Sequence, residues 1–124
     1  MEEKNNKLIF QVESALNGVT VELTQKKFDE HIVTNHPEMK GHEKDIEKTI
    51  INPTIIRQAK IKPKRRFEFI RKVVNNKEVS AYNNVMVEYN DESKKTAHVV
   101  TSFYSDDIGK GGGECVYFKY NNNI

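Results

Sequence analysis

The stretch RFEFIRKVV, residues 66–74, alternates apolar with charged side chains and contains neither glycine nor proline. This two-residue alternation, built from aromatic and β-branched residues, predicts a β-strand. Alternate residues of a strand share a face, so Phe67, Phe69 and Arg71 would lie on one side and Arg66 on the other. Each face of the predicted strand therefore carries both apolar and basic groups.

Similar patterns flank this strand on both sides. Further strands are expected at residues 8–12, 19–23, 84–89, 97–104 and 114–120. The dipeptide Asn17-Gly18 joins the first two, and it is typical of a tight hairpin turn. Turn-forming Asn, Asp and Gly residues separate the later strands. The sequence thus predicts a hairpin at the start of the chain and a run of strands at its end.

The segment between these strand-rich regions has helical spacing. Thr24 is a suitable N-cap for a helix that ends near Asn35, before Pro37. A second helix is expected over residues 43–51, and a short helical turn over 54–59. Because strands and helices are segregated along the chain, we expect an α+β fold. The expected architecture is an N-terminal hairpin and two helices packed on a four-stranded antiparallel sheet.

The 124 residues are the usual length of one domain, and their charges are unevenly distributed. Residues 57–77 hold nine basic side chains and one acidic one, whereas the rest of the chain is acidic overall. A concentrated basic segment is typical of proteins that bind a polyanion. It is equally typical of a strand edge that lysines protect from aggregation. Charge alone leaves both interpretations open.

The sequence also bears on location. Cys115 is the single cysteine, so no disulfide forms within the chain, and its apolar neighbours predict a small core residue. No stretch has the length and character of a signal peptide or a membrane span. We therefore expect a cytoplasmic protein, or one that is delivered into the cytoplasm of a target cell.

Four histidines offer groups that titrate near pH ~6.5 and can serve as acid and base. His31 falls in the first predicted helix and His36 just after it. Either can also have a structural role, His31 by packing on the sheet edge and His36 by capping the helix. A zinc site built from His31, His36, His42 and Glu43 fits none of the known ligand spacings, so no metal site is predicted.

Four blocks of the chain together resemble a known group of nucleases. They are LTQKKFDEHIVTNHPE (residues 23–38), IEKTIINPTII (46–56), RFEFIR (66–71) and VVTSFY (99–104). They are similar to the phage-associated branch of the barnase–EndoU–colicin–RelE superfamily. The resemblance covers a core of about residues 19–120 and leaves residues 1–18 as an added strand and turn. Its final aromatic position is split here between Phe103 and Tyr104.

The resemblance implies a barnase/RelE-like fold and an endoribonuclease that needs no metal or other cofactor. Attack of the RNA 2′-hydroxyl would leave a 2′,3′-cyclic phosphate. The implied catalytic residues are His31, His36, Arg66, Arg71, Thr101 and Tyr104. The basic segment adds the RNA-binding candidates Lys62, Lys64, Arg65 and Lys72. This interpretation requires His31, Arg71 and Thr101 to lie close together in space.

The implied partners are RNA, with tRNA among the candidates, and a cognate antitoxin or immunity protein; no membrane is involved. Two alternatives remain. The chain can be a non-catalytic RNA- or protein-binding module on the same scaffold, in which case RNA would bind without being cut. It can also be a phage-derived structural protein that kept the fold and has no affinity for RNA.

Overall fold

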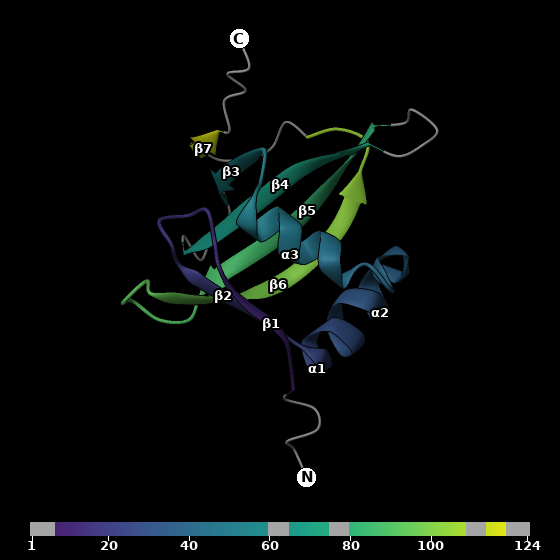
Figure 1. The fold of residues 1–124 in the computed structure, drawn as a ribbon, viewed down its shortest axis with the longest axis horizontal. Helices are drawn as coiled ribbons and strands as arrows, with labels where there is room; N and C mark the ends of the chain where they lie inside the picture. Colours follow the sequence, from purple (N-terminus) through teal and green to yellow (C-terminus); the bar gives the residue numbers. More distant parts are fainter. Residues whose placement is uncertain (1–6, 60–64, 75–79, 109–113, 119–124) are drawn as a thin grey trace.

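The computed structural model describes residues 7–59, 65–74, 80–108 and 114–118 (Figure 1). These residues form one twisted sheet with helices over part of one face. The strands are β1 (Leu8–Glu13), β2 (Thr20–Thr24), β3 (Ile55–Gln58), β4 (Arg66–Val74), β5 (Ser80–Tyr89), β6 (Thr96–Ser105) and β7 (Cys115–Phe118). Their order across the sheet is β1-β2-β6-β5-β4-β3-β7.

The sheet is mixed, because one of its strand pairs is parallel. β2 runs parallel to β6, with Thr20 opposite Thr96 and Glu22 opposite His98. The other neighbouring strands are antiparallel. The N-terminal hairpin is thereby part of the main sheet and extends it beyond β6.

The expected pair of helices on a four-stranded antiparallel sheet is therefore wrong. Two segments account for the difference. The hairpin joins β6 through the parallel pairing, and residues 55–58, expected as a helical turn, form β3 instead. Ile56 lies opposite Phe69 of β4 on one side and Tyr117 of β7 on the other. These long-range partners satisfy the backbone groups of β3, so local helical preference does not decide its conformation.

The helical elements are α1 (Gln25–Lys27), η2 (Phe28–Ile32, π-helical), α2 (Val33–Asn35), η3 (Pro37–Met39, 3₁₀) and α3 (Glu43–Ile51). The first three follow one another without a break. Thr24 Oγ1 accepts a hydrogen bond from the Lys27 backbone N–H at 3.2 Å, which confirms the predicted N-cap. The prediction of a helix over residues 43–51 is likewise confirmed.

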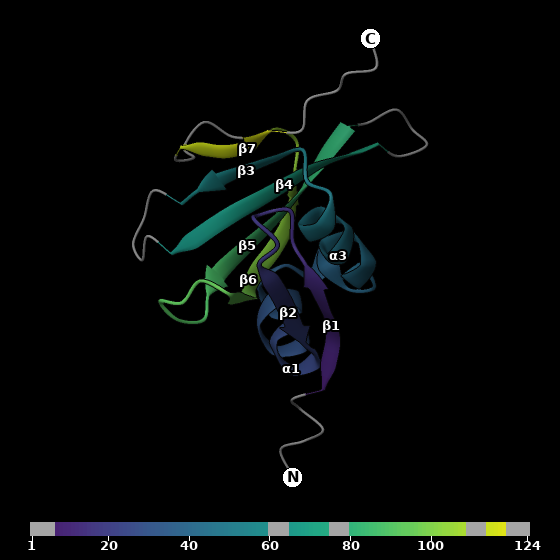
Figure 2. The ribbon, with the colours of Figure 1, turned by 60° about the vertical axis from the view of Figure 1, so that its left-hand side comes forward.

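The hydrophobic core lies between the helices and one face of the sheet. α3 crosses β4, β5 and β6 and also contacts β1, as Figures 1 and 2 show from two sides. Ile46 and Ile50 of α3 are fully buried against Phe69 and Val85. Each buried isoleucine contributes about 1.5–3 kcal/mol by leaving water. This burial holds the start of α3 at a fixed place over the central strands.

A β-bulge in β6 decides which of its side chains face α3. Val99 lies opposite Val87, but Thr101 lies opposite Met86, so Val100 is an extra residue. The extra residue reverses the alternation of side chains beyond it. Ser102 and Tyr104 consequently share the helix-covered face with Val99, whereas Thr101 points to the other face.

Two remaining sequence expectations concern exposure. Cys115 is exposed in β7, so its prediction as a core residue is wrong. In the part of the chain that the structure describes, no helix has both the length and the apolar character needed to span a membrane.

Candidate functional site

The carboxylate of Asp45, at the start of α3, joins side chains from three elements. Arg71 Nη2 of β4 donates a hydrogen bond to Asp45 Oδ1 at 3.2 Å. The Tyr104 hydroxyl of β6 donates a hydrogen bond to Asp45 Oδ2. Nδ1 of His42, which lies just before α3, is 3.6 Å from the same Oδ2 atom. One carboxylate is thus shared by a guanidinium, a phenol and an imidazole.

Two features of the fold bring these residues together. They are the pairing of neighbouring strands and the spacing of residues at the start of α3. Arg71, Asn83 and Tyr104 form a row across β4, β5 and β6, because the strand registers pair them directly. His42 and Asp45 are three residues apart at the start of α3, which places them on one side of the helix. Burial of the α3 core residues then sets the Asp45 carboxylate over the row.

A chain of hydrogen bonds between polar side chains links Arg71 to Thr49, Asn83 and Ser102 in the interior. Arg71 Nε donates to Thr49 Oγ1 at 3.1 Å, and Thr49 Oγ1 donates to Asn83 Oδ1 at 2.7 Å. Asn83 Nδ2 donates to Ser102 Oγ at 3.2 Å, and Ser102 Oγ donates to the Asn84 carbonyl at 2.8 Å. Because each hydrogen bond orders the next, the chain fixes the orientation of the Arg71 guanidinium.

Some N–H donors of the Arg71 guanidinium have no hydrogen-bond partner among the described residues. Of its five N–H groups, the Arg71 side chain uses Nε toward Thr49 and one N–H of Nη2 toward Asp45. Its side chain is 19% exposed. The remaining N–H groups are available to an anion that approaches from solvent, and a planar guanidinium suits phosphate oxygens.

A second imidazole–carboxylate pair lies beside the first. His36 Nδ1 is 3.8 Å from Glu38 Oε2, and the His36 ring stacks on Phe103 with 5.2 Å between centroids. The His42 ring meets Tyr104 edge-on, with 5.6 Å between centroids. Two consecutive aromatic residues of β6 therefore each contact one histidine, Tyr104 on the face that α3 covers and Phe103 on the other face of the strand. Both imidazoles are reachable from solvent, since their side chains are 34% and 49% exposed.

The environment of Tyr104 keeps its phenol protonated. Burial raises the pKa of Tyr104 well above its usual range, and the hydrogen bond to Asp45 and the charge of that carboxylate raise it further. Glu38 adds to the rise, and Arg71 opposes it. At neutral pH the hydroxyl is thus a hydrogen-bond donor that holds Asp45 in place, and it does not act as a base.

The structure does not bring His31 and Thr101 to this cluster. Thr101 pairs with Met86 on the sheet face opposite to Arg71, because of the bulge described above. His31 is exposed at the end of η2 and lines a separate pocket. The close approach of His31, Arg71 and Thr101 that the sequence interpretation required is absent. Of the predicted catalytic residues, Arg71 and Tyr104 meet at Asp45 of α3, whereas His36 contacts Glu38 and Phe103.

The arginines of the basic segment are largely paired within the chain. Arg57 Nη2 lies 2.9 Å from Glu68 Oε1, and Arg66 Nη2 lies 2.7 Å from Glu88 Oε1. Arg65 Nε lies 3.6 Å from the other oxygen of Glu88. The Arg66 hydrogen bond holds the pKa of the Glu88 carboxyl below its usual range. The predicted catalytic residue Arg66 is thereby occupied on the face opposite to Arg71.

The remaining RNA-binding candidates are Lys62, Lys64 and Lys72. Lys72 is exposed at the far end of β4. Lys62 and Lys64 lie outside the described residues. Since Arg65, Arg66 and Arg71 have carboxylate partners from other parts of the chain, the charge excess seen along the sequence is reduced in space. The polyanion interpretation of this segment loses much of its basis.

Sequence reasoning missed the residue at the centre of the site. Asp45 was not singled out, Glu38 entered only as part of a motif, and His42 was considered only as a zinc ligand. One signal was present: Asp45 and Thr49 are polar, four residues apart, and border the apolar stripe formed by Ile46 and Ile50. Polar residues at that border face the edge of the core, where they can meet polar groups of the sheet.

The described residues contain no group of three or more His, Cys, Asp and Glu side chains that could hold a metal ion. Comparison with known proteins finds no matching family model, no matching curated protein and no matching solved structure.

Proposed function

We propose that this chain is an endoribonuclease whose reaction takes place at the Asp45-centred cluster. The observation that carries the proposal is the placement of the His42–Asp45 pair beside the partly unused guanidinium of Arg71, with the carboxylate of a second pair, His36–Glu38, near enough to Tyr104 to raise its pKa. RNA cleavage without a metal needs an acid, a base and a cation near the phosphate. The cluster contains all three.

In the proposed step, a neutral imidazole removes the proton of the RNA 2′-hydroxyl as its oxygen bonds to the adjacent phosphorus. The bond from phosphorus to the 5′-oxygen breaks, and the second, protonated imidazole donates its proton to that leaving oxygen. The products are a 2′,3′-cyclic phosphate and a free 5′-hydroxyl. His36 and His42 serve as this pair, which replaces the pair of His31 and His36 expected from the sequence.

The carboxylates and the arginine assist these imidazoles in different ways. A carboxylate facing Nδ1 favours a proton on that nitrogen and leaves Nε2 free to exchange a proton with the substrate. Asp45 would do this for His42, and Glu38 for His36. The free N–H groups of Arg71 would stabilise the extra negative charge on the pentacoordinate phosphorus. Tyr104 is a positioning residue, since its hydroxyl is committed to Asp45.

A non-catalytic RNA- or protein-binding module is the second candidate. One observation favours it: Thr49, Asn83 and Ser102 satisfy one another in the interior, as the members of a purely structural network do. This candidate predicts that RNA stays intact at every pH. It also predicts that removal of either imidazole leaves any binding unchanged.

The test is incubation of the purified protein with tRNA or total RNA in the presence of EDTA. We expect cleavage that survives chelation and is lost in His36→Ala and in His42→Ala. Lys48→Ala is the control, because it removes an exposed side chain of α3 that belongs to neither histidine pair. Cleavage that EDTA abolishes would refute the metal-free mechanism. If cleavage were lost in His31→Ala but retained in His42→Ala, the reaction would take place at η2 and not at the cluster.

The resemblance to the barnase–EndoU–colicin–RelE superfamily supports the same type of reaction, but it rests on the four sequence blocks alone. The biological setting is proposed on that basis too: a toxin or phage-borne nuclease that acts on RNA in a cytoplasm, with a cognate antitoxin or immunity protein as its inhibitor. Cleavage with the residue dependence stated above would support the reaction independently of the resemblance.

A further inference from the structure

The helical segment formed by α1, η2 and α2 carries positive charges that have no ion pair. Lys26 and Lys27 lie on it, and neither has an ion-pair partner among the described residues. Arg57 and Arg66 differ, because carboxylates within the chain already pair with them. For an anion that approaches from solvent, unpaired charges are the stronger attraction.

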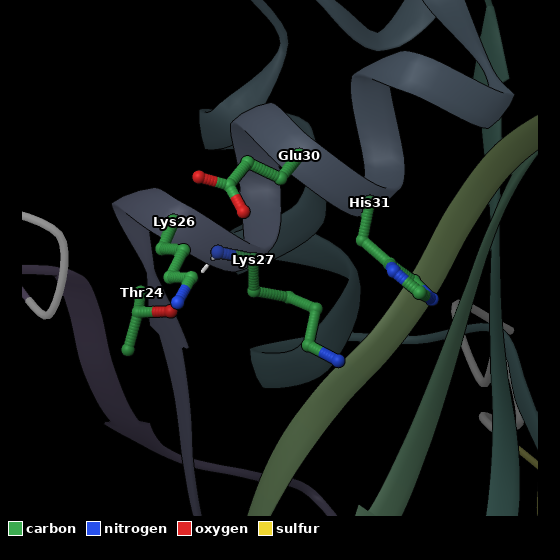
Figure 3. A pocket seen from close by; sticks show the side chains of 5 residues that line it. All are labelled: Thr24, Lys26, Lys27, Glu30 and His31. Atoms are coloured by element: carbon green, nitrogen blue, oxygen red, sulfur yellow. Dashed lines mark hydrogen bonds between the residues drawn. The ribbon is translucent and has the colours of Figure 1, made fainter.

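These cationic side chains surround one pocket. It is lined by Thr24, Lys26, Lys27, Glu30 and His31. Figure 3 shows Lys27 and His31 extending toward the neighbouring strand β6, whereas the Glu30 carboxylate turns to the other side of the helical segment. The part of the pocket nearest β6 is therefore its cationic part.

This pocket and the proposed catalytic cluster lie along the same strand. Burial lowers the pKa of His98 in β6, and Lys27 is close enough for its charge to lower that pKa further. Further along β6, Phe103 stacks on His36. η2 also contacts β6. The strand from His98 to Phe103 is roughly 15 Å long at a rise of about 3.3 Å per residue.

We infer that the junction between this helical segment and β6 binds the backbone of a single RNA strand, with Lys27 and His31 holding phosphates some nucleotides away from the one that is cleaved. The inference rests on the proposed function and adds to it the path of the substrate. A strand that follows β6 would pass Lys27, then His31, and reach His36 with its scissile phosphate at the cluster. The RNA contacts would then come from the helical segment and not from the basic strand β4.

Lys27 and Glu30 line the pocket with opposite charges, so removal of one charge or the other should change RNA affinity in opposite directions. Lys27→Ala removes a phosphate contact, so affinity falls and the salt dependence of binding weakens. Loss of one contact to a single strand lowers the slope of log K against log salt by about 0.7. Glu30→Gln removes a negative charge from the same pocket, so we expect tighter binding. Lys72→Ala removes an exposed lysine from β4, and it tests the alternative that RNA binds along this basic strand.

The measurement is fluorescence anisotropy of a 2′-O-methyl RNA oligonucleotide, which cannot be cleaved by 2′-hydroxyl attack, at several salt concentrations. Lys48→Ala is the matched control, since it removes an exposed lysine from α3. The inference predicts weaker binding for Lys27→Ala, tighter binding for Glu30→Gln, and wild-type binding for Lys48→Ala and Lys72→Ala.

The outcomes separate this inference from the proposed function. If the wild type cleaves RNA but Lys27→Ala binds as tightly as wild type, the path along the helical segment is wrong. If Lys72→Ala lost as much RNA affinity as Lys27→Ala, the path along the helical segment would also be wrong. If binding depends on Lys27 and Glu30 as stated but RNA stays intact, the binding site stands and the nuclease proposal fails. No binding by the wild type at low salt would overturn the inference.

Discussion

Tyr104 and Asp45 are joined by a hydrogen bond although they lie 59 positions apart in the sequence. The phenol comes from the end of β6 and the carboxylate from the first turn of α3. Their contact fastens the start of the helix to the central sheet. It also fixes the carboxylate that faces Arg71 and His42, so the stability of this junction and the chemistry proposed for it depend on the same atoms.

Alkaline unfolding should report the contact. The pKa of Tyr104 is raised in the folded protein, so the folded state keeps a proton that the unfolded state loses above about pH 10. The resulting stabilisation is complete below pH 10 and is lost as the pH rises toward the folded pKa. We expect the free energy of unfolding, measured in urea, to fall more steeply between about pH 9 and 11 in the wild type than in Tyr104→Phe.

Tyr89 is the internal reference for this measurement. Burial raises its pKa too, and it is present in both proteins, so its contribution cancels in the comparison. Identical pH dependence in the wild type and in Tyr104→Phe would show that the phenol does not titrate differently in the folded state.

The buried Asn83 should be important for stability beyond its size. Asn83→Ala leaves Thr49 and Ser102 without their shared partner in the interior. Thr49 Oγ1 keeps the Asp45 carbonyl at 2.8 Å and Ser102 Oγ keeps the Asn84 carbonyl at 2.8 Å, so the substitution removes two buried hydrogen bonds of about 0.5–1.5 kcal/mol each. We expect a clear fall in the urea midpoint for Asn83→Ala. Gln11→Ala, on the exposed side of β1, should stay within about 0.5 kcal/mol of the wild type, and a similar result for Asn83→Ala would contradict the network.

The local parts of this fold could be predicted from the sequence, whereas the arrangement of the sheet could not. Thr24 and Pro37 bound the first helical segment by their own chemistry, and Ile46 and Ile50 mark the buried side of α3. β3 was mistaken for a helical turn because its strand partners are distant in the chain. The parallel pairing of β2 with β6 leaves no local signal either.

The hairpin turn is one local feature that the structure confirms. Asn17 and Gly18 both have positive φ, at 54° and 74°, and the Val19 N–H donates to the Leu16 carbonyl at 3.0 Å. This geometry is the type I′ turn expected for Asn-Gly. A Cβ at position 18 would meet no atom within 4 Å, so the effect of Gly18→Ala is purely conformational.

We therefore expect Gly18→Ala to destabilise the protein by about 1 kcal/mol, measured as a shift in the urea unfolding curve. A loss of several kcal/mol would mean that the position is more constrained than the turn geometry indicates. An unchanged midpoint would contradict the left-handed conformation itself.

The bulge at Val100 should be required for the site. Deletion of Val100 would restore regular alternation along β6 and turn either the residues before position 100 or those after it to the wrong face. If the first half of the strand keeps its register, Tyr104 leaves Asp45. We expect loss of the Tyr104-dependent step in alkaline unfolding, together with lower stability. Val100→Ala, which keeps the extra residue, should retain that step, and retention in the deletion variant would contradict the proposed register.

The same bulge explains why only part of the site could be predicted. In a regular strand, Thr101 and Phe103 would share the sheet face of Val99. Because of the extra residue, Ser102 and Tyr104 lie on that face instead. A bulge depends on backbone geometry across two strands, which residue types do not reveal. Arg71 was identified because its alternation within β4 is regular. Asp45 was missed because its importance comes from partners on three other segments.

The most direct test of the central claim is the pH dependence of cleavage of one defined RNA oligonucleotide in EDTA, measured under single-turnover conditions. With His36 and His42 as acid and base, the wild type should give a bell-shaped profile. His42→Ala should lower the maximal rate by about 10²- to 10⁴-fold and remove one limb of the bell. An inert wild type, or a His42→Ala variant with an unchanged rate and profile, would contradict the placement of the reaction at this cluster.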